Sequence, residues 1–88
     1  MKGIPQEWID RLFDCMALFY GKRWTSQFQN AYHKELHKTI WKSGLIGLNY
    51  DQIKKELYYR RKEALKKSIF PPRVVEFYDH ASAFLTST

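Results

Sequence analysis

The sequence predicts an all-α protein, a compact bundle of four helices, or of five if the second helical region is broken. Three observations predict this fold class. Apolar residues recur three and four positions apart over long stretches, as they do on one face of a helix. No segment shows the sustained apolar-polar alternation of a half-buried strand. Glycines and prolines fall between the periodic stretches, where they end helices.

The first helix is expected to begin near Pro5 and to end at Gly21. Proline is favoured in the first helical turn, and acidic residues such as Glu7 interact favourably with the positive end of the helix dipole. The apolar positions of this stretch are Trp8, Leu12, Cys15 and Phe19, flanked by Ile9, Phe13, Met16 and Tyr20. Such a wide aromatic face predicts a helix packed against the core.

The second helical region is expected from about Lys22 to Ser43, with Gln29-Asn30 as the point where it would break into a short and a longer helix. One apolar stripe is expected along it, formed by Trp24, Phe28, Tyr32, Leu36, Ile40 and Trp41. A turn flanked by Gly44 and Gly47 follows, with Leu45, Ile46 and Leu48 packed beneath it.

The third helix is expected to begin after Asn49, because Asn is a preferred N-cap and Gln52 lies three residues further on, as in a capping box. Its inward residues are expected to be Ile53, Leu57, Ala64 and Leu65. Pro71-Pro72 ends it, since neither proline can donate a backbone N–H. A fourth helix is expected from about Pro72 to Leu85, with Val75, Tyr78 and Phe84 buried and Val74 and Phe77 beside them.

Eighty-eight residues, 44% of them hydrophobic, predict a single domain over 1–88 with an ordered core at about 4–85. Cys15 is the only cysteine, which excludes an internal disulfide and fits a reducing compartment. The start of the sequence does not resemble a signal peptide, and no apolar run approaches the roughly 20 residues needed to span a bilayer. We therefore expect a soluble cytoplasmic protein with no membrane partner.

Positive charge is concentrated in the middle of the chain. The net charge is +6, and residues 21–44 and 45–68 each carry +4, whereas residues 1–20 and 69–88 each carry −1. This asymmetry predicts a polyanion or an acidic protein as partner. A lysine-rich surface that is merely solvated explains the same composition.

The residues that could carry chemistry do not form a catalytic pattern. His33 and His37 lie four apart, a spacing found in metal sites, but Lys34 occupies the position that zinc peptidases give to Glu. There is no glycine-rich phosphate loop and no Ser-His-Asp order. We expect surface histidines and a non-enzyme with no catalytic residue, no cofactor and no metal.

The basic third helix is the candidate binding site. Tyr58-Tyr59-Arg60-Arg61-Lys62 interleaves aromatic rings with guanidinium and ammonium groups, which suits stacking on bases and neutralising phosphates. The residues predicted to face nucleic acid are Lys54, Lys55, Tyr59, Arg60, Arg61, Lys62, Lys66 and Lys67. The alternative is a solvated face on which Glu56 and Glu63 pair with neighbouring lysines.

A set of short motifs resembles the small helical domain of bacteriophage replication proteins of the lambda replication protein P type and of related phage helicase loaders. In chain order these motifs are Tyr20-Gly21, Trp24, Phe28, Trp41, Gly47-Leu48, Ile53, Leu57, Phe70-Pro71-Pro72 and Val75-Glu76-Phe77. The resemblance covers residues 4–80. Where family members can carry Trp-Cys after the Glu-Phe pair, this chain has Tyr78-Asp79.

The resemblance implies an accessory DNA replication protein that binds the replicative hexameric helicase as a loader, an adaptor or an inhibitor, with single-stranded DNA as an open second partner. Trp8 and Phe77 are the residues to consider first for protein contact, should either be exposed. Two other functions remain open at this point: a small basic regulator that binds duplex DNA, and an interaction module for an acidic protein.

Overall fold

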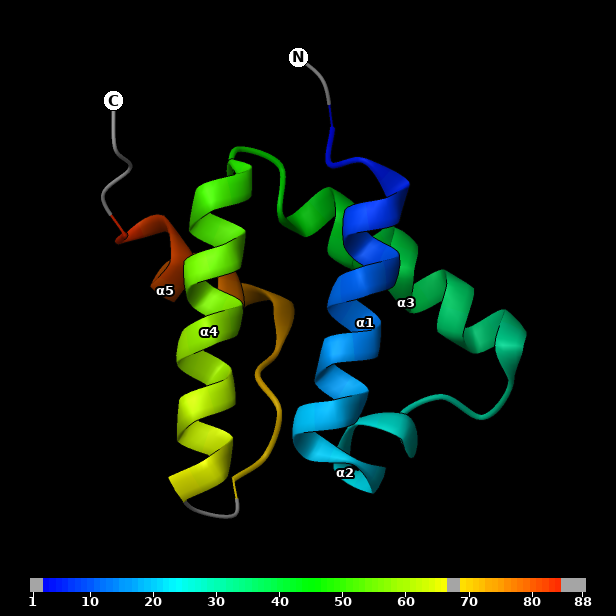
Figure 1. Cartoon of the computed structure of the whole chain (residues 1–88). Helices are drawn as coiled ribbons and strands as arrows, with labels where there is room; N and C mark the ends of the chain where they lie inside the picture. Colours follow the sequence, from blue (N-terminus) through cyan, green and yellow to red (C-terminus); the bar gives the residue numbers. More distant parts are fainter. Residues whose placement is uncertain (1–2, 67–68, 85–88) are drawn as a thin grey trace.

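The protein is an all-α bundle in its five-helix form (Figure 1). The computed structural model describes residues 3–66 and 69–84, and no strand occurs within these ranges. The helices are α1 (Gln6–Tyr20), α2 (Lys22–Thr25), α3 (Ala31–Gly44), α4 (Tyr50–Lys66) and α5 (Val74–Ser82). The body is flattened, with principal extents of 39 × 32 × 19 Å.

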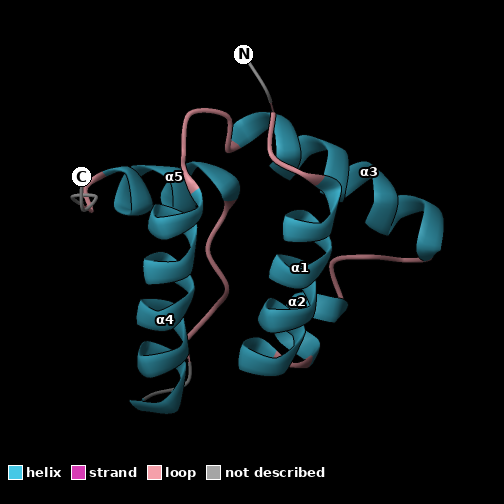
Figure 2. Cartoon of the chain, turned by 45° about the horizontal axis from the view of Figure 1, so that its top comes forward, coloured by secondary structure: helices cyan, strands magenta, loops and turns pink. Residues whose placement is uncertain are grey.

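Helix α4 packs against two helices, α1 and α5, and this places it where a binding groove can form along it. Helices α1 and α4 lie side by side, and α3 packs on both α1 and α5 (Figures 1 and 2). The short α2 packs on α1, and its Trp24 also reaches Trp41 of α3. The outer side of α4 is therefore bordered by α1 and α5.

Aromatic rings from four helices form the centre of the core. Trp24 of α2 lies 5.0 Å from Phe13 of α1 and 5.7 Å from Trp41 of α3, measured between ring centroids. Trp41 lies 5.5 Å from Phe77 of α5 in the same edge-to-face geometry. Large rings fill a small interior with few residues, and each edge-to-face pair adds about 0.5–1.5 kcal/mol beyond its buried area.

Helix α1 ends where expected, but its most buried row differs from the predicted one. Gly21 adopts φ +58°, a conformation that glycine adopts without steric cost, and its N–H donates to the Ala17 carbonyl. The buried residues are Ile9, Leu12, Phe13, Met16 and Tyr20. Of the row expected at the centre, Leu12 is buried as predicted, whereas Trp8, Cys15 and Phe19 are half-buried. Helices α2 and α3 cover one side of α1 while α4 covers the other, and this row lies toward the α4 edge.

The second helical region does break, and the break changes which face of α3 is buried. Asn30 caps α3 by accepting a hydrogen bond from the His33 N–H at 2.9 Å. Tyr32, Leu36 and Ile40, expected on the core stripe, are exposed instead. The turn at 26–30 interrupts the helix between α2 and α3. Apolar positions counted continuously from α2 into α3 therefore do not lie on one face.

The capping box at the start of α4 is confirmed. The Asn49 N–H donates to Gln52 Oε1 at 3.0 Å, and the Gln52 N–H donates to Asn49 Oδ1 at 2.8 Å. Leu65, expected to face inward, is exposed in the last turn of α4.

Helix α5 begins later than expected, at Val74, after an extended segment that contains both prolines. This start sets the buried face of α5, which consists of Phe77 and Ala81. Val75, expected in the core, is therefore exposed, and Tyr78 and Phe84 are half-buried. Leu85 lies outside the described residues.

The turn between α3 and α4 agrees only in part with the sequence. Leu45 and Leu48 are buried there as predicted, whereas Ile46 is exposed.

Candidate nucleic-acid interface

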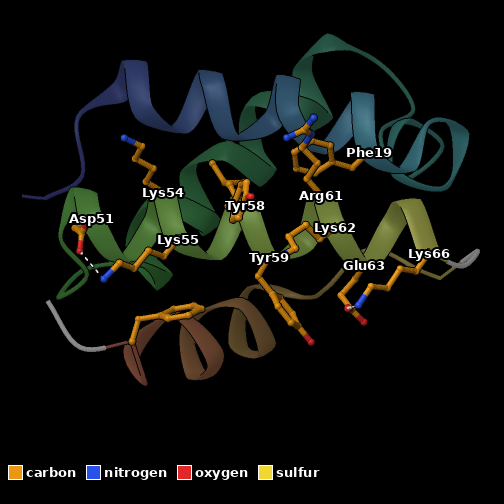
Figure 3. Close-up of a pocket in the computed structure, with 12 residues that line it drawn as sticks. Phe19, Asp51, Lys54, Lys55, Tyr58, Tyr59, Arg61, Lys62, Glu63 and Lys66 are labelled. Atoms are coloured by element: carbon orange, nitrogen blue, oxygen red, sulfur yellow. Dashed lines mark ion pairs between the residues drawn. The ribbon is translucent and has the colours of Figure 1, made fainter.

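A groove of about 880 Å³ runs along the outer face of α4 and is bordered by α1 and α5 (Figure 3). Phe19 of α1 and Phe84, just after α5, contribute from the two sides. The residues from α4 are Asp51, Lys54, Lys55, Leu57, Tyr58, Tyr59, Arg61, Lys62, Glu63 and Lys66. At 1.5 Å per residue, the lining from Asp51 to Lys66 extends over about 22 Å.

The groove carries a net positive charge. It contains five cationic and two acidic side chains, which gives +3. The acidic groups are each paired within the helix, Asp51 with Lys55 at 3.1 Å and Glu63 with Lys66 at 3.6 Å. Ion pairs near the surface contribute little to stability. In Figure 3, Arg61 is directed toward Phe19 at the α1 border, and Lys54 is also directed toward α1.

Tyrosine rings are interspersed with these cations. The Tyr58 ring is exposed, and the Lys62 ammonium lies 5.1 Å from its centroid. Tyr59 stacks on His80 of α5 at a centroid distance of 4.3 Å. Flat rings beside ammonium and guanidinium groups are what a single strand needs, because its bases stack and its phosphates require counter-charges.

A buried ionic network lies on the other side of α4. The Glu56 carboxylate is fully buried between α4 and α5. Arg60 Nε donates to Glu56 Oε2 at 2.7 Å, and His80 Nδ1 contacts Glu56 Oε1. The local pairing of Glu56 with lysines, considered from the sequence, is therefore wrong, and this residue joins the two helices instead.

The structure brings together most of the predicted nucleic-acid-facing residues. Lys54, Lys55, Tyr59, Arg61, Lys62 and Lys66 all line the groove. Arg60 does not, because its side chain is 15% exposed and its guanidinium is directed to Glu56. Lys67 lies outside the described residues.

Six lining residues were not among those predicted from the sequence, namely Phe19, Asp51, Leu57, Tyr58, Glu63 and Phe84. Tyr58 belongs to the Tyr-Tyr-Arg-Arg-Lys run, and this signal was sufficient to include it. Phe19 and Phe84 reach the groove only through the packing of α1 and α5 on α4, and no local pattern in the sequence indicates that packing.

The two residues considered for protein contact are not freely exposed. Phe77 is fully buried against Trp41, so its proposed role as a contact residue is wrong. The apolar neighbours of Phe77 in the sequence did not indicate whether its ring faces the core or the solvent. Trp8 is half-buried, with its ring 5.0 Å from that of Tyr50.

Other chemistry-bearing groups give no second site in residues 3–66 and 69–84. No group of three His, Cys, Asp or Glu side chains there could hold a metal ion. His37 packs edge-to-face on Phe28 at 5.0 Å. Burial raises the pKa of the Cys15 thiol, which makes it less nucleophilic at neutral pH. In the same residues, none of the helices combines the length and the apolar character that crossing a bilayer requires.

No protein-family model, curated protein or solved structure matches this chain.

Proposed function

We propose that this protein is a non-enzymatic accessory factor of DNA replication in the cytoplasm, and that it binds single-stranded DNA along the α4 groove. The observation that carries this proposal is the combination of exposed tyrosine and cationic side chains on one accessible helix face. Rings and cations in this arrangement match the two recurrent features of single-stranded nucleic acid, unstacked bases and closely spaced phosphates.

A single strand fits this groove better than a duplex. Stacking on an aromatic side chain is worth about 1–3 kcal/mol per base, and it requires a base face that a duplex does not offer. Tyr58, the most exposed ring of the groove, would gain this energy only from an unpaired base. A lining about 22 Å long accommodates a short single-stranded segment, of the order of the smallest sites found in single-strand binders, about four nucleotides.

The replicative hexameric helicase is the protein partner that we propose. This part of the proposal is supported by the resemblance of the motifs at Tyr20-Gly21 and Phe70-Pro71-Pro72 to phage helicase loaders of the lambda replication protein P type. A factor that holds single-stranded DNA on a basic groove could deliver the helicase to an opened strand or withhold the helicase from it.

Fluorescence anisotropy with a labelled thymidine oligomer, compared with a duplex of equal length, tests the DNA-binding part. We expect the single strand to bind more tightly, with log affinity falling by about 0.7 per log unit of salt for each phosphate contacted. Arg61→Glu with Lys62→Glu should weaken binding at least about tenfold, because both side chains line the groove. The matched control is Lys22→Glu with Arg73→Glu, which makes the same charge change outside the groove.

Three outcomes would contradict the DNA-binding proposal. If the two double charge reversals weakened DNA binding equally, only the net charge of the protein would matter. Tighter, sequence-dependent binding to the duplex would favour a duplex DNA regulator. Retention of neither nucleic acid at physiological salt would favour a module for an acidic protein. The helicase part is tested separately, by co-purification of the hexamer with the tagged protein from bacterial lysate, and absence of the hexamer contradicts that part alone.

A further inference from the structure

A second groove, of about 400 Å³, lies between α3 and the segment 69–73 that leads into α5. It shares no lining residue with the α4 groove. Its apolar lining includes Ile40 and Trp41 of α3 and Phe70 and Pro71 of the segment. Two arginines, Arg23 and Arg73, also line it.

The apolar part of this groove is open to solvent. Ile40 is 55% exposed and Phe70 is 78% exposed. Leu36 and Tyr32, spaced four residues apart along α3, are also exposed and continue the apolar surface from Ile40 along the same helix face. A contiguous apolar surface of this kind, beside a shaped groove, is typical of a protein-interaction site.

Contacts within the protein position one wall of the groove. Arg23 Nη1 donates to the Ile69 carbonyl at 3.2 Å, and the Arg23 guanidinium lies 4.9 Å from the Phe70 ring centroid. These contacts fix the segment against α2. Pro71 and Pro72 have restricted φ angles and no backbone N–H. An extended peptide would find no backbone donor at these two positions, which favours a helical occupant over strand pairing.

The charge of the groove selects an acidic occupant. Its lining contains two arginines and no carboxylate. Two acidic residues lie two positions from lining residues in the sequence: Glu76 accepts a hydrogen bond from the Arg73 backbone N–H at 2.9 Å, and Glu35 pairs with Lys38 at 3.4 Å. A second copy of this chain would bring the same arginines and another +6 of charge, which opposes self-association through this surface.

We propose that the groove between α3 and segment 69–73 binds an amphipathic helix of an acidic partner protein. Apolar side chains of that helix would pack on Ile40 and Phe70, while its flanking carboxylates would pair with Arg23 and Arg73. This inference goes beyond the proposed function and does not depend on DNA binding, because the two grooves have different linings.

Selection from a displayed library of random peptides tests the inference. The library is selected on the wild-type protein and depleted on Ile40→Lys with Phe70→Ser. The enriched sequences should carry apolar residues three and four positions apart, flanked by Glu or Asp. A fluorescein-labelled copy of the most enriched peptide should bind the wild type, and its affinity for the depletion variant should be at least about tenfold lower.

The matched control is Leu18→Lys with Leu65→Ser, which makes similar changes at two residues that are 84% and 78% exposed and lie outside the groove. This control should bind the peptide as the wild type does. A peptide with Lys at every acidic position should not bind. Circular dichroism of each variant shows whether it is folded, and all four substitutions lie at exposed side chains.

Three results would overturn the inference. One is a selection that enriches no sequence on the wild type over the depletion variant. Another is enrichment of neutral or basic peptides. The third is concentration-dependent self-association of the wild type in sedimentation velocity that the Ile40 and Phe70 substitutions abolish, since the occupant would then be a second copy. The depletion variant should still bind the thymidine oligomer. That result would show that loss of peptide binding is independent of the α4 groove.

Discussion

Replacing Arg60 with Ala is expected to lower the free energy of unfolding by about 3 kcal/mol. Glu56 is fully buried and the Arg60 side chain is 15% exposed, so the substitution removes a charge-assisted hydrogen bond from a mostly dry site. Such bonds contribute about 1.5–3 kcal/mol, and leaving one partner of a buried ion pair costs about 3–5 kcal/mol. His80 still contacts the carboxylate, which places the expected loss at the lower end.

This loss is large for an 88-residue domain, whose total stability is expected to be about 4–13 kcal/mol. It corresponds to a fall in Tm of about 12–24 °C. Urea titration and thermal unfolding followed by circular dichroism measure both quantities. Arg61→Ala is the matched control, because it removes the same group from the next, exposed position and should change stability by less than about 0.5 kcal/mol.

A double-mutant cycle with Glu56→Gln isolates the interaction itself. Once the buried charge has been removed, Arg60→Ala should cost at least about 1 kcal/mol less than it does in the wild type. Additive effects in this cycle, or equal effects of Arg60→Ala and Arg61→Ala, would refute the assignment of Arg60 to the buried network.

Three further predictions concern helix packing, pH and thiol reactivity. Gly44→Ala should destabilise the protein by about 1–2 kcal/mol in urea titration, because the new Cβ would lie 2.6 Å from Val74 Cγ2. This loss is expected although Ala is the better helix former. Adding Val74→Ala should recover part of the loss. The hydrogen bond from Lys38 holds the pKa of Asp10 in the folded protein below its ordinary value. The stability that Asp10 contributes is therefore complete above the unfolded-state pKa of about 3.9, and it is lost as the pH falls through the lower folded-state pKa. Asp10→Asn should therefore be less stable than the wild type at about pH 7, and the difference should vanish in acid; a constant difference would contradict this linkage. Burial raises the pKa of Cys15, so at about pH 8 the folded protein should react with iodoacetamide more slowly than free glutathione does, and unfolding in urea should accelerate the reaction.

The helix boundaries that depend on local chemistry could be predicted from the sequence. Gly21 ends α1, Asn30 begins α3, and Asn49 with Gln52 begins α4. Each of these boundaries is set by the backbone preference or side-chain hydrogen bond of one or two residues. Such interactions act over three or four positions, and sequence spacing therefore contains them.

The burial of helix faces could be predicted less well, because it depends on which other helices arrive. Ile40 and Leu65 have the apolar character and the helical spacing of core residues, yet both are exposed. Nothing in the described residues covers the face of α3 that carries Ile40. Leu65 lies in the last turn of α4, and α4 is longer than α5, the helix that packs beside it. An apolar stripe predicts that a helix has a face to bury, but not that a partner helix exists to cover it.

The candidate site shows the same division. The cations of α4 could be predicted because they lie in one helix, but Arg60 and Arg61 could not be distinguished. Consecutive helical residues point about 100° apart. The packing of α1 and α5 on α4 decides between them: Glu56 is buried where His80 of α5 reaches it, and Arg60 turns to Glu56 while Arg61 faces the groove.

The buried network also determines the shape of the groove. A buried ion pair stabilises a fold no better, on average, than apolar side chains of similar volume, so stability alone does not account for its effect here. His80 contacts Glu56, stacks on Tyr59 and meets Phe84 edge-to-face at 5.4 Å, and both of these rings line the groove. Sliding or rotating α5 along α4 would remove His80 from Glu56 Oε1 while Arg60, which lies on α4, stayed at Oε2, whereas an apolar contact would tolerate such a shift. The carboxylate thus fixes one position of α5 on α4, and with it the border of the surface that we propose binds DNA.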